Sequence, residues 1–424
     1  MFVNKIFYLC LLLFSLTGNI QIGYTVFVMS RKEQGQKPKN IRDINRNIIL
    51  DIYRNNTTVS AALLAQSINL SKTTVMKINK ELLDKKIIKK VGKGRSTDEG
   101  GKKPVLYSLI ENSKLILAFH IHYTKIEFRL FNLRCNCILN DETVISKNES
   151  FPAIVSAMKD LLDGQNLLRN SDNLYLACMV AIHGDTDSET GQCIHSTYFP
   201  AWEKEHNLIH TIKKICKLSC PIYIDNWIRM RAYGENRLGK AQGRKSVVLI
   251  DAGQHGVTSG ILIDGKVFKG CHSLAGEIGH ICMDVHSSIP CACGNTGCFE
   301  SLVSYTRLLS RTKKENGKKF KTLLEIFSAA DSGDRTAKEA LDTVSPWFAL
   351  AISTFILFFD PEMILVEGDF AAGCNYFETS IKQQIKRFIL PRVNWKTDLI
   401  FNNCQSVDAL TGAAILAMDL FFRV

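Results

Sequence analysis

Four residues in the second half of the chain have the types and the spacing of a metal site. They are His280, Cys291, Cys293 and Cys298. One imidazole and three thiolates complete a tetrahedral shell around zinc and leave no open position, which is typical of a structural rather than a catalytic metal. The alternative is that these cysteines are core thiols clustered by chance. The donor set and its spacing favour a structural Zn²⁺ site.

The other cysteines indicate a reducing compartment rather than a disulfide framework. The chain has 14 cysteines in 424 residues, a density well below that of small secreted scaffolds. Most of them stand alone in the sequence, as Cys178, Cys216 and Cys374 do. Such isolated residues are expected to be buried thiols.

Charge is unevenly distributed along the chain, and this distribution divides the chain into two parts. The formal net charge is +12. Residues 29–108 hold 18 Lys and Arg against 7 Asp and Glu, whereas residues 109–424 hold 34 of each. A small basic module joined to a neutral body is typical of a protein that binds a polyanion through one part only.

The basic module has the pattern of a helix-turn-helix. The spacing of its apolar residues predicts helices over 41–53, 61–66 and about 72–86. Ser60 and Ser71 precede the second and third helices and are expected to be their N-caps. The third helix would then present a polar and basic face that can enter a major groove.

A wing is expected after the third helix. Two alternating segments, 87–91 and 105–109, flank a stretch rich in Gly and Lys, which predicts a hairpin with a basic tip. We therefore predict binding to a double-stranded DNA operator, by a symmetric dimer because one copy contacts a single half-site. The residues expected to contact DNA are Ser71, Lys72, Thr73, Thr74, Lys77 and Lys80 in the helix and Lys93, Arg95, Lys102 and Lys103 in the wing. The alternative is a helical bundle with a solvated, charged surface.

The remainder of the chain has the pattern of an α/β body. Strands are expected over 115–122, 125–132, 137–144, 174–182, 222–225, 247–251 and 260–263, and helices within 323–359. A body of this length is too large for one simple layer and is compatible with two lobes around a cleft. The expected domains are a winged helix-turn-helix over 29–110 and a body over 114–424.

Two motifs of the body resemble those of the ROK family of bacterial sugar kinases and sugar-responsive repressors. Residues 276–280 match Gly-Glu-x-Gly-His, and residues 291–300 match Cys-x-Cys-Gly-x-x-Gly-Cys-x-Glu. Weaker matches are Gly184, 199–202, 233–235, 263–265, 359–362 and 410–414. A winged helix-turn-helix in front is the layout of the transcriptional-repressor branch, the NagC/XylR type. The resemblance implies a two-lobed actin-like (ribonuclease-H-like) fold with a sugar in the cleft.

The resemblance also implies effector-binding residues. Carried over by position, Glu277, His280 and Glu300 would contact sugar hydroxyls, with His280 bound to zinc through its other ring nitrogen. Further positions of the family's sugar site are occupied here by Gly184, Asn226 and Trp227. The alternative is that the cleft is an empty relic and the body only dimerises.

Departures from the family's kinases predict that no catalytic residue remains. The first phosphate loop, Asp-x-Gly-Gly-Thr in the kinases, reads His-Ile-His-Tyr-Thr at 120–124. The second, glycine-rich loop has fewer glycines here and reads Gly-Val-Thr-Ser-Gly at 256–260. Glycines allow close approach of the backbone to phosphate, and a His-Tyr pair obstructs it. Trp227 stands where the catalytic Asp is expected, and an indole cannot accept a proton from a sugar hydroxyl. Asp225 lies about 6–7 Å away along a strand and could substitute only if the register slipped.

Residues 1–28 form an apolar N-terminal extension whose status the sequence leaves open. No charge occurs between Ile6 and Ser30, and basic residues follow at once. The stretch could be an artefact of start-site choice with translation from Met29, a membrane anchor, or a secretion signal. An anchor followed by basic residues leaves the module inside the cell, so either of the first two predicts a cytoplasmic protein.

The sequence as a whole predicts a DNA-binding transcriptional regulator that represses carbohydrate genes. Its expected partners are operator DNA, a small carbohydrate or phosphosugar effector, and further copies of itself as a homodimer or dimer of dimers. The alternative is an ATP-dependent sugar kinase that carries a DNA-binding arm.

Overall fold

The computed structural model describes residues 38–94, 103–146, 149–168, 174–196, 198–204, 207–313, 317, 319–391, 395–403 and 407–421. The N-terminal extension, Arg95 and Lys102 therefore lie outside the described residues. Compact packing divides the chain into residues 1–50 and residues 51–424, and the boundary falls inside the first described helix.

The elements predicted for the basic module are present in the predicted order. They are α3 (Pro38–Asn55), β1 (Val59–Ser60), α4 (Ala61–Ser67), α5 (Lys72–Asp84), β2 (Ile88–Lys93) and β3 (Val105–Leu109). Both predicted N-caps are confirmed: Ser60 accepts a hydrogen bond from the Leu63 amide, and Ser71 accepts one from the Thr74 amide. Asn69 has a φ of 51° in the turn between α4 and α5, a conformation that Asn tolerates better than most residues.

Helix α5 separates an apolar face from a basic face. Its buried residues are Val75, Ile78, Asn79 and Leu82. The side-chain oxygen of the buried Asn79 accepts a hydrogen bond from the Tyr53 hydroxyl at 3.0 Å. Lys72, Thr73, Lys77 and Lys80 are exposed. After α5, β2 and β3 pair in antiparallel fashion. Beyond the last paired residues of the two strands, the Gly94 amide donates a hydrogen bond to the Pro104 carbonyl.

The first lobe of the body is built on a five-stranded sheet. Its elements are β4 (Leu115–Ile121), β5 (Lys125–Asn132), β6 (Cys137–Val144), α6 (Phe151–Gly164), β7 (Tyr175–Ile182), β8 (Asp185–Asp187), β9 (Gln192–His195), a 3₁₀ turn (Pro200–Lys204), α7 (Leu208–Cys216), β10 (Ile222–Asn226) and α8 (Trp227–Leu238). The strand order is β10-β7-β4-β5-β6, in which β4, β7 and β10 are parallel and β5 is antiparallel to both of its neighbours.

The second lobe repeats this topology. Its elements are β11 (Val247–Gly253), β12 (Gly256–Ile263), β13 (Lys266–Val267), a 3₁₀ turn (Ile278–His280), α9 (Phe299–Leu302), α10 (Tyr305–Arg311), α11 (Leu323–Asp331), α12 (Arg335–Phe359), β14 (Met363–Glu367), a 3₁₀ turn (Asp369–Ala371), α13 (Asn375–Phe388), β15 (Asp398–Phe401) and α14 (Ala409–Phe421). The order β13-β12-β11-β14-β15 corresponds strand for strand to that of the first lobe. The predicted two-lobed α/β body is confirmed.

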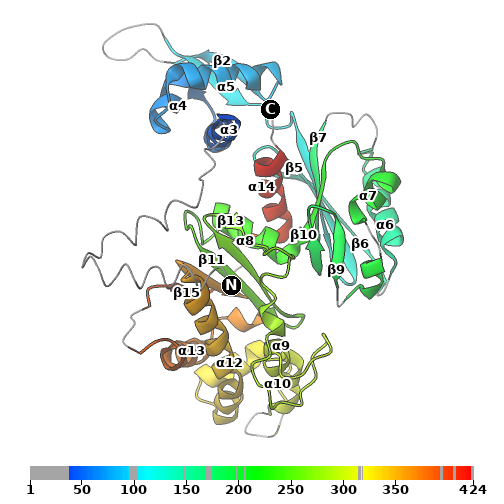
Figure 1. Ribbon diagram of the computed structural model, residues 1–424, viewed down its shortest axis with the longest axis vertical. Coiled ribbons are helices and arrows are strands. Elements are labelled where there is room, and N and C mark those ends of the chain that lie inside the picture. Colours follow the sequence, from blue (N-terminus) through cyan, green and yellow to red (C-terminus); the bar gives the residue numbers. More distant parts are fainter. Residues whose placement is uncertain are drawn as a thin grey trace, which may run out of the picture. The chain divides into compact units, whose positions relative to one another are not determined.

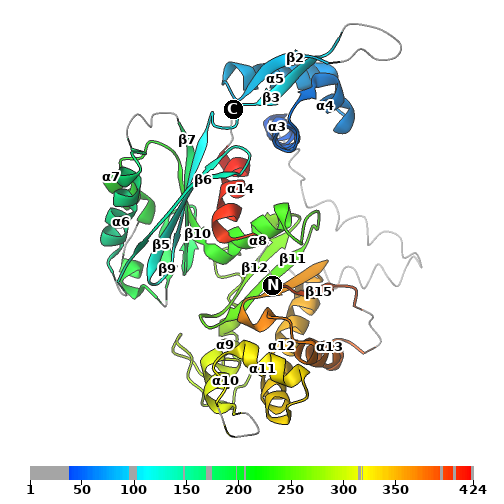
Figure 2. The same cartoon turned by 180° about the vertical axis from the view of Figure 1, so that it is seen from behind.

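Helices cover both sheets and join the lobes (Figures 1 and 2). In the first lobe, α6 and α7 cover the outer face of the sheet and α14 covers the other. In the second lobe, α12 and α13 bury one face and α8 packs on the other. Helices α8 and α14 touch at Gly234 and Gly412: a Cβ on Gly234 would lie 2.8 Å from the Gly412 Cα. Glycine is required here because any side chain would push the helices apart.

Helix α12 is long and apolar enough to cross a membrane by length and composition, with a mean hydropathy of 1.5 over its most apolar window. Its apolar residues include Phe348, Ile352 and Phe355, which are buried in the core of the second lobe. A buried helix of a globular core is apolar for the same reason as a membrane span. Packing in the core therefore accounts for the composition of α12.

Candidate ligand cleft and cysteine–histidine cluster

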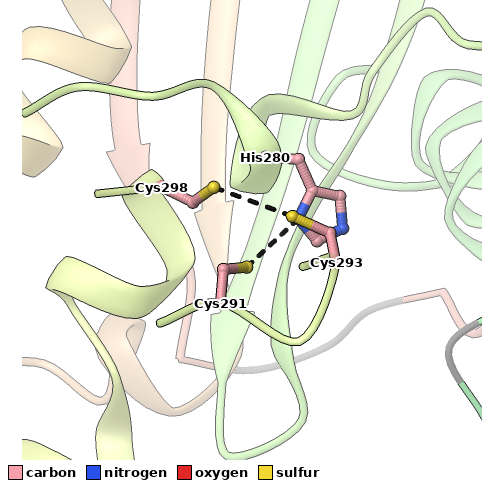
Figure 3. A group of neighbouring side chains, drawn as sticks. All are labelled: His280, Cys291, Cys293 and Cys298. Carbon is pink, nitrogen blue, oxygen red and sulfur yellow. Dashed lines mark hydrogen bonds between the residues drawn. The ribbon is translucent and has the colours of Figure 1, made fainter. Parts of the chain in front are cut away.

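The four predicted metal ligands lie close together in the second lobe (Figure 3). One donor atom from each of His280, Cys291, Cys293 and Cys298 lies within 4.8 Å of the others. The His280 Nδ1 is 3.6 Å from the Cys291 Sγ, and the Cys293 and Cys298 Sγ atoms are 3.8 Å apart. It is therefore the Nδ1 side of the imidazole that faces the thiols, which leaves Nε2 on the opposite side of the ring.

Two glycines allow the chain to bring His280 to the cysteines. Gly276 has a φ of 104°, and a Cβ there would lie 2.2 Å from the Ser259 carbonyl oxygen. At Gly279 a Cβ would lie 2.2 Å from the Val257 carbonyl oxygen. The segment therefore crosses directly over β12, where no side chain fits. This close crossing explains both glycines of the Gly-Glu-x-Gly-His motif.

The chemistry of the cluster fits a metal cation. Burial and the two neighbouring thiols raise the pKa of Cys298 to about 12, since three thiolates at this spacing repel one another. A divalent cation reverses that balance, because a coordinating thiol is deprotonated outright. The cluster can thus hold a metal ion, and three thiols with one imidazole are the donors of closed structural zinc sites.

A cavity of about 120 Å³ lies between the lobes, beside the cluster. It opens at the carboxyl ends of β7, β10 and β11, the edge where open α/β sheets bind their ligands. The residues that line it are His183, Gly184, Asp185, His195, Ser196, Tyr198, Asn226, Trp227, Asp251, His255, Gly256, Val257, Thr258, Glu277, His280 and Glu300. A second hollow of about 490 Å³ shares Tyr198, His255, Gly256, Val257 and Glu300 and continues the cleft outward.

All six residues expected to bind an effector line this cavity: Gly184, Asn226, Trp227, Glu277, His280 and Glu300. Burial and the neighbouring Asp185 carboxylate raise the pKa of Glu277 to about 8. Glu277 is therefore mostly protonated at neutral pH and can donate a hydrogen bond to a ligand. The Glu300 Oε2 accepts a bond from the Val257 amide at 2.9 Å, which fixes this carboxylate at the wall of the cavity.

Asp225, the carboxylate two residues before Trp227 in the chain, is held by two basic side chains. Its carboxylate is 3.1 Å from Arg229 and 2.9 Å from Lys269, and its exposed fraction is 1%. Asp225 does not line the cavity, whereas Trp227 does. Of the two, Trp227 is the side chain that a ligand in the cavity would meet.

The two turns that correspond to phosphate loops in the family's kinases contact each other. Tyr123 follows β4, and His255 lies between β11 and β12. The Tyr123 hydroxyl is 3.2 Å from the His255 Nε2. Tyr198 stacks on Tyr123 with ring centroids 5.3 Å apart and donates to the His255 carbonyl at 2.7 Å. Aromatic side chains thus join the two turns beside the cavity that Tyr198 and His255 line.

A buried ion network crosses from α8 to the second lobe, and sequence reasoning missed it. Arg231 binds Asp251 at 2.6 Å and also Glu367, to which Asn402 donates. Asp251 and Glu367 are partners in the register of the parallel strands β11 and β14. Two carboxylates placed side by side in this way would repel each other, so the guanidinium between them compensates both charges.

Sequence reasoning also missed several residues that complete the cleft. Asp185, His195, Ser196, Asp251 and His255 line the cavity without belonging to a recognisable motif. His183, which directly precedes the matched Gly184, also lines the cavity. Trp202, in contrast, belongs to a matched motif but is a core residue, fully buried and stacked on Phe199 with ring centroids 4.1 Å apart.

Comparisons with known proteins agree with this geometry. The sequence model of the ROK family matches residues 117–420. The xylose repressor of Caldicellulosiruptor bescii is 25% identical over 375 residues, covering 85% of this chain and 92% of that protein. The glucokinase of Halalkalibacterium halodurans is 30% identical over 224 residues, covering 50% of this chain and 66% of that enzyme.

A solved structure extends the likeness beyond the body. It is a ROK-family transcriptional regulator, a homologue of the Escherichia coli MLC protein, and it superposes with a TM-score of 0.72 at 21% identity. The match covers 90% of this chain and 97% of that structure. A likeness at this identity shows the fold, while the family model covers almost the whole body. The chain belongs to the ROK family.

Proposed function

We propose that the protein is a cytoplasmic transcriptional repressor of carbohydrate genes that binds an operator through its winged helix-turn-helix. In this proposal the module binds an inverted repeat as a homodimer or as a dimer of dimers. Zn²⁺ held by His280, Cys291, Cys293 and Cys298 organises the body beside the effector cleft. A small carbohydrate or phosphosugar in that cleft shifts the body between two arrangements and so changes operator affinity.

The observation that carries the proposal is the division of α5 into two faces. Val75, Ile78 and Leu82 are buried, while Lys72, Thr73, Lys77 and Lys80 are exposed on the same helix. Hydroxyls and amines on a helix of this size can reach base edges and phosphates in a major groove. In the wing, Lys93 and Lys103 are also exposed. Ser71 and Thr74 share a hydrogen bond of 2.8 Å, so their hydroxyls preorganise the start of α5.

The cleft supports ligand sensing rather than phosphoryl transfer. Glu277 and Glu300 are positioned at its wall as the sugar contacts of the family would be. Trp227 replaces the base, Asp225 is held by two cations, and Tyr123 closes the phosphate approach onto His255. The named relatives include a repressor and a glucokinase, so these side chains, rather than the relatives, speak against catalysis.

A gel-shift series with the gene's own upstream DNA tests the function. We expect a specific complex with this DNA. At least one member of a broad panel of sugars and phosphosugars should weaken or strengthen that complex. If the effector binds in the cleft, Glu300→Gln should reduce this response to sugar. The affinity for operator DNA without sugar should stay unchanged, because Glu300 lies in the body and not in the DNA-binding module. An operator affinity unchanged by every sugar would contradict the effector role. Failure to form any specific complex would contradict the proposed repressor function.

The second candidate function, a sugar kinase with a DNA-binding arm, is favoured by the glucokinase match. A coupled assay for ADP release in the presence of ATP, Mg²⁺ and the same sugar panel separates the two. We expect no turnover above the rate without sugar. Sustained turnover would show that our interpretation of Trp227 is wrong.

The zinc assignment predicts a change in metal content. Cys291→Ser removes one of four ligands of a closed site, and we expect it to lower bound zinc by one equivalent per chain, measured by elemental analysis. Cys271→Ser is the matched control, since Cys271 is an exposed cysteine outside the cluster. Equal zinc content in the two variants would show that these four residues do not bind zinc.

A further inference from the structure

Three histidines gather at the carboxyl edge of the first lobe's sheet. His120 and His122 stand two residues apart at the end of β4 and so point to the same face. Strand β7 runs parallel to β4 with Ile121 opposite Ile182, which places His183 directly beside His122. One ring nitrogen from each histidine lies within 4.8 Å of the others, the same span as in the cysteine–histidine cluster.

The Nε2 atoms of this cluster lack the partners that buried polar atoms require. The Nε2 atoms of all three rings are shielded from solvent and have no hydrogen-bond partner among the described residues. A carboxylate oxygen of Glu127 is 3.5 Å from the His122 Nε2, longer than a normal hydrogen bond. Three such atoms in one place are unusual, because buried polar groups are almost always paired.

The protonation state suits metal binding. Burial, together with the neighbouring imidazoles, lowers the pKa of His183 to about 3 and lowers that of His120 well below its usual value. Both rings are therefore neutral at physiological pH, and each carries a lone pair on one nitrogen. Stacking alone does not account for the cluster: the His120 and His122 ring centroids are 3.7 Å apart, but ring contact leaves the nitrogen lone pairs unused.

We propose that His120, His122 and His183 form a second metal site, distinct from the cysteine–histidine cluster, that binds a first-row transition metal ion. Imidazole nitrogen suits Zn²⁺, Co²⁺ and Ni²⁺, whereas Mg²⁺ prefers oxygen ligands. Ligand nitrogens about 2.0–2.1 Å from a tetrahedral zinc lie about 3.4 Å apart, so loading requires ring movements on the order of 1 Å.

The site has consequences for the cleft. Three protein ligands leave a fourth position open on a tetrahedral metal. His183 and Trp227 both line the cavity, and the centroids of their rings are 5.1 Å apart. The open position is thus available to water or to an oxygen donor of a molecule in the cleft. A transition metal would occupy the edge of the sheet at which the family's kinases hold nucleotide phosphates.

Loading with Co²⁺ tests this proposal, because the two kinds of site have different absorption spectra. Zinc-replete protein is titrated with Co²⁺, and total zinc plus cobalt is counted after gel filtration. We expect two metal ions per chain. Cobalt at the histidines gives weak d–d bands without the intense thiolate charge-transfer bands that cobalt gives at the cysteine–histidine cluster. The double variant His122→Ala/His183→Ala should hold one metal ion and retain its zinc.

His255→Ala provides the matched control, since His255 lies in the same cleft but outside the three-histidine cluster. This variant should still bind two metal ions. A single metal ion per chain in the wild type overturns the proposal, and so does a second ion that persists in the double variant or disappears in His255→Ala. Cysteine-bound zinc retained in the double variant shows that loss of the second ion does not arise from unfolding.

Discussion

Arg231→Met is expected to lower the free energy of unfolding by about 3–5 kcal/mol, the range for breaking a buried ion pair from one side. The Arg231 side chain has an exposed fraction of 2% and binds Asp251 and Glu367 at once. Methionine fills much of the volume but leaves two carboxylates at adjacent positions of β11 and β14. Urea unfolding followed by tryptophan fluorescence measures the loss.

Arg244→Met is the matched control for this loss. Arg244 also binds a carboxylate, that of Asp398, but the exposed fractions of the two side chains are 41% and 48%. An exposed pair contributes at most about 1 kcal/mol. The triple variant Arg231→Met/Asp251→Asn/Glu367→Gln should recover much of the lost stability, since no buried charge remains uncompensated. If Arg231→Met were no more harmful than Arg244→Met, the network would not have the role assigned to it.

The loss should also depend on pH. Burial raises the pKa of Glu367 to about 7 even though Arg231 opposes the shift. Between its unfolded pKa near 4.5 and this value, the folded state binds more protons than the unfolded state, so stability falls as the pH rises. Removal of the guanidinium raises the folded pKa further. Arg231→Met should therefore be less destabilised at pH 5 than at pH 8.

The triple variant Lys72→Ala/Lys77→Ala/Lys80→Ala is expected to bind operator DNA roughly a hundredfold to a thousandfold more weakly at physiological salt. All three ammonium groups project from the exposed face of α5, where each would neutralise a phosphate or contact a base edge. Each phosphate contact that is lost should reduce the slope of log K against log salt by about 0.9. A fluorescence-anisotropy titration at several salt concentrations measures both quantities.

Removing the same charge elsewhere distinguishes a specific contact from net charge. Lys213, Lys214 and Lys386 are exposed on α7 and α13 of the body. Their triple replacement by Ala changes the net charge equally and should leave operator affinity within severalfold of wild type. Equal losses in the two triple variants would indicate that α5 is not the DNA-contacting helix.

Local features were predictable from the sequence because they depend on residues close together in the chain. The caps at Ser60 and Ser71, the turn at Asn69 and the buried face of α5 follow from spacing of one to four residues. The cysteine–histidine cluster was predictable for the same reason, since one short segment carries all four ligands. The predicted α/β class is confirmed, although strand β12 begins at Gly256 rather than at Gly260.

Contacts between distant segments were decided only by the tertiary structure. The sequence places His120 and His183 far apart in the chain, and it contains no sign that they meet. The parallel register of β4 and β7 brings them together, and the register of β11 and β14 likewise pairs Asp251 with Glu367. Register depends on the packing of whole sheets, to which every strand contributes, so no local pattern encodes it. The sequence by itself thus determined the family, the basic module and the segment that carries the cysteine–histidine cluster, while the fold decided which side chains share the cleft.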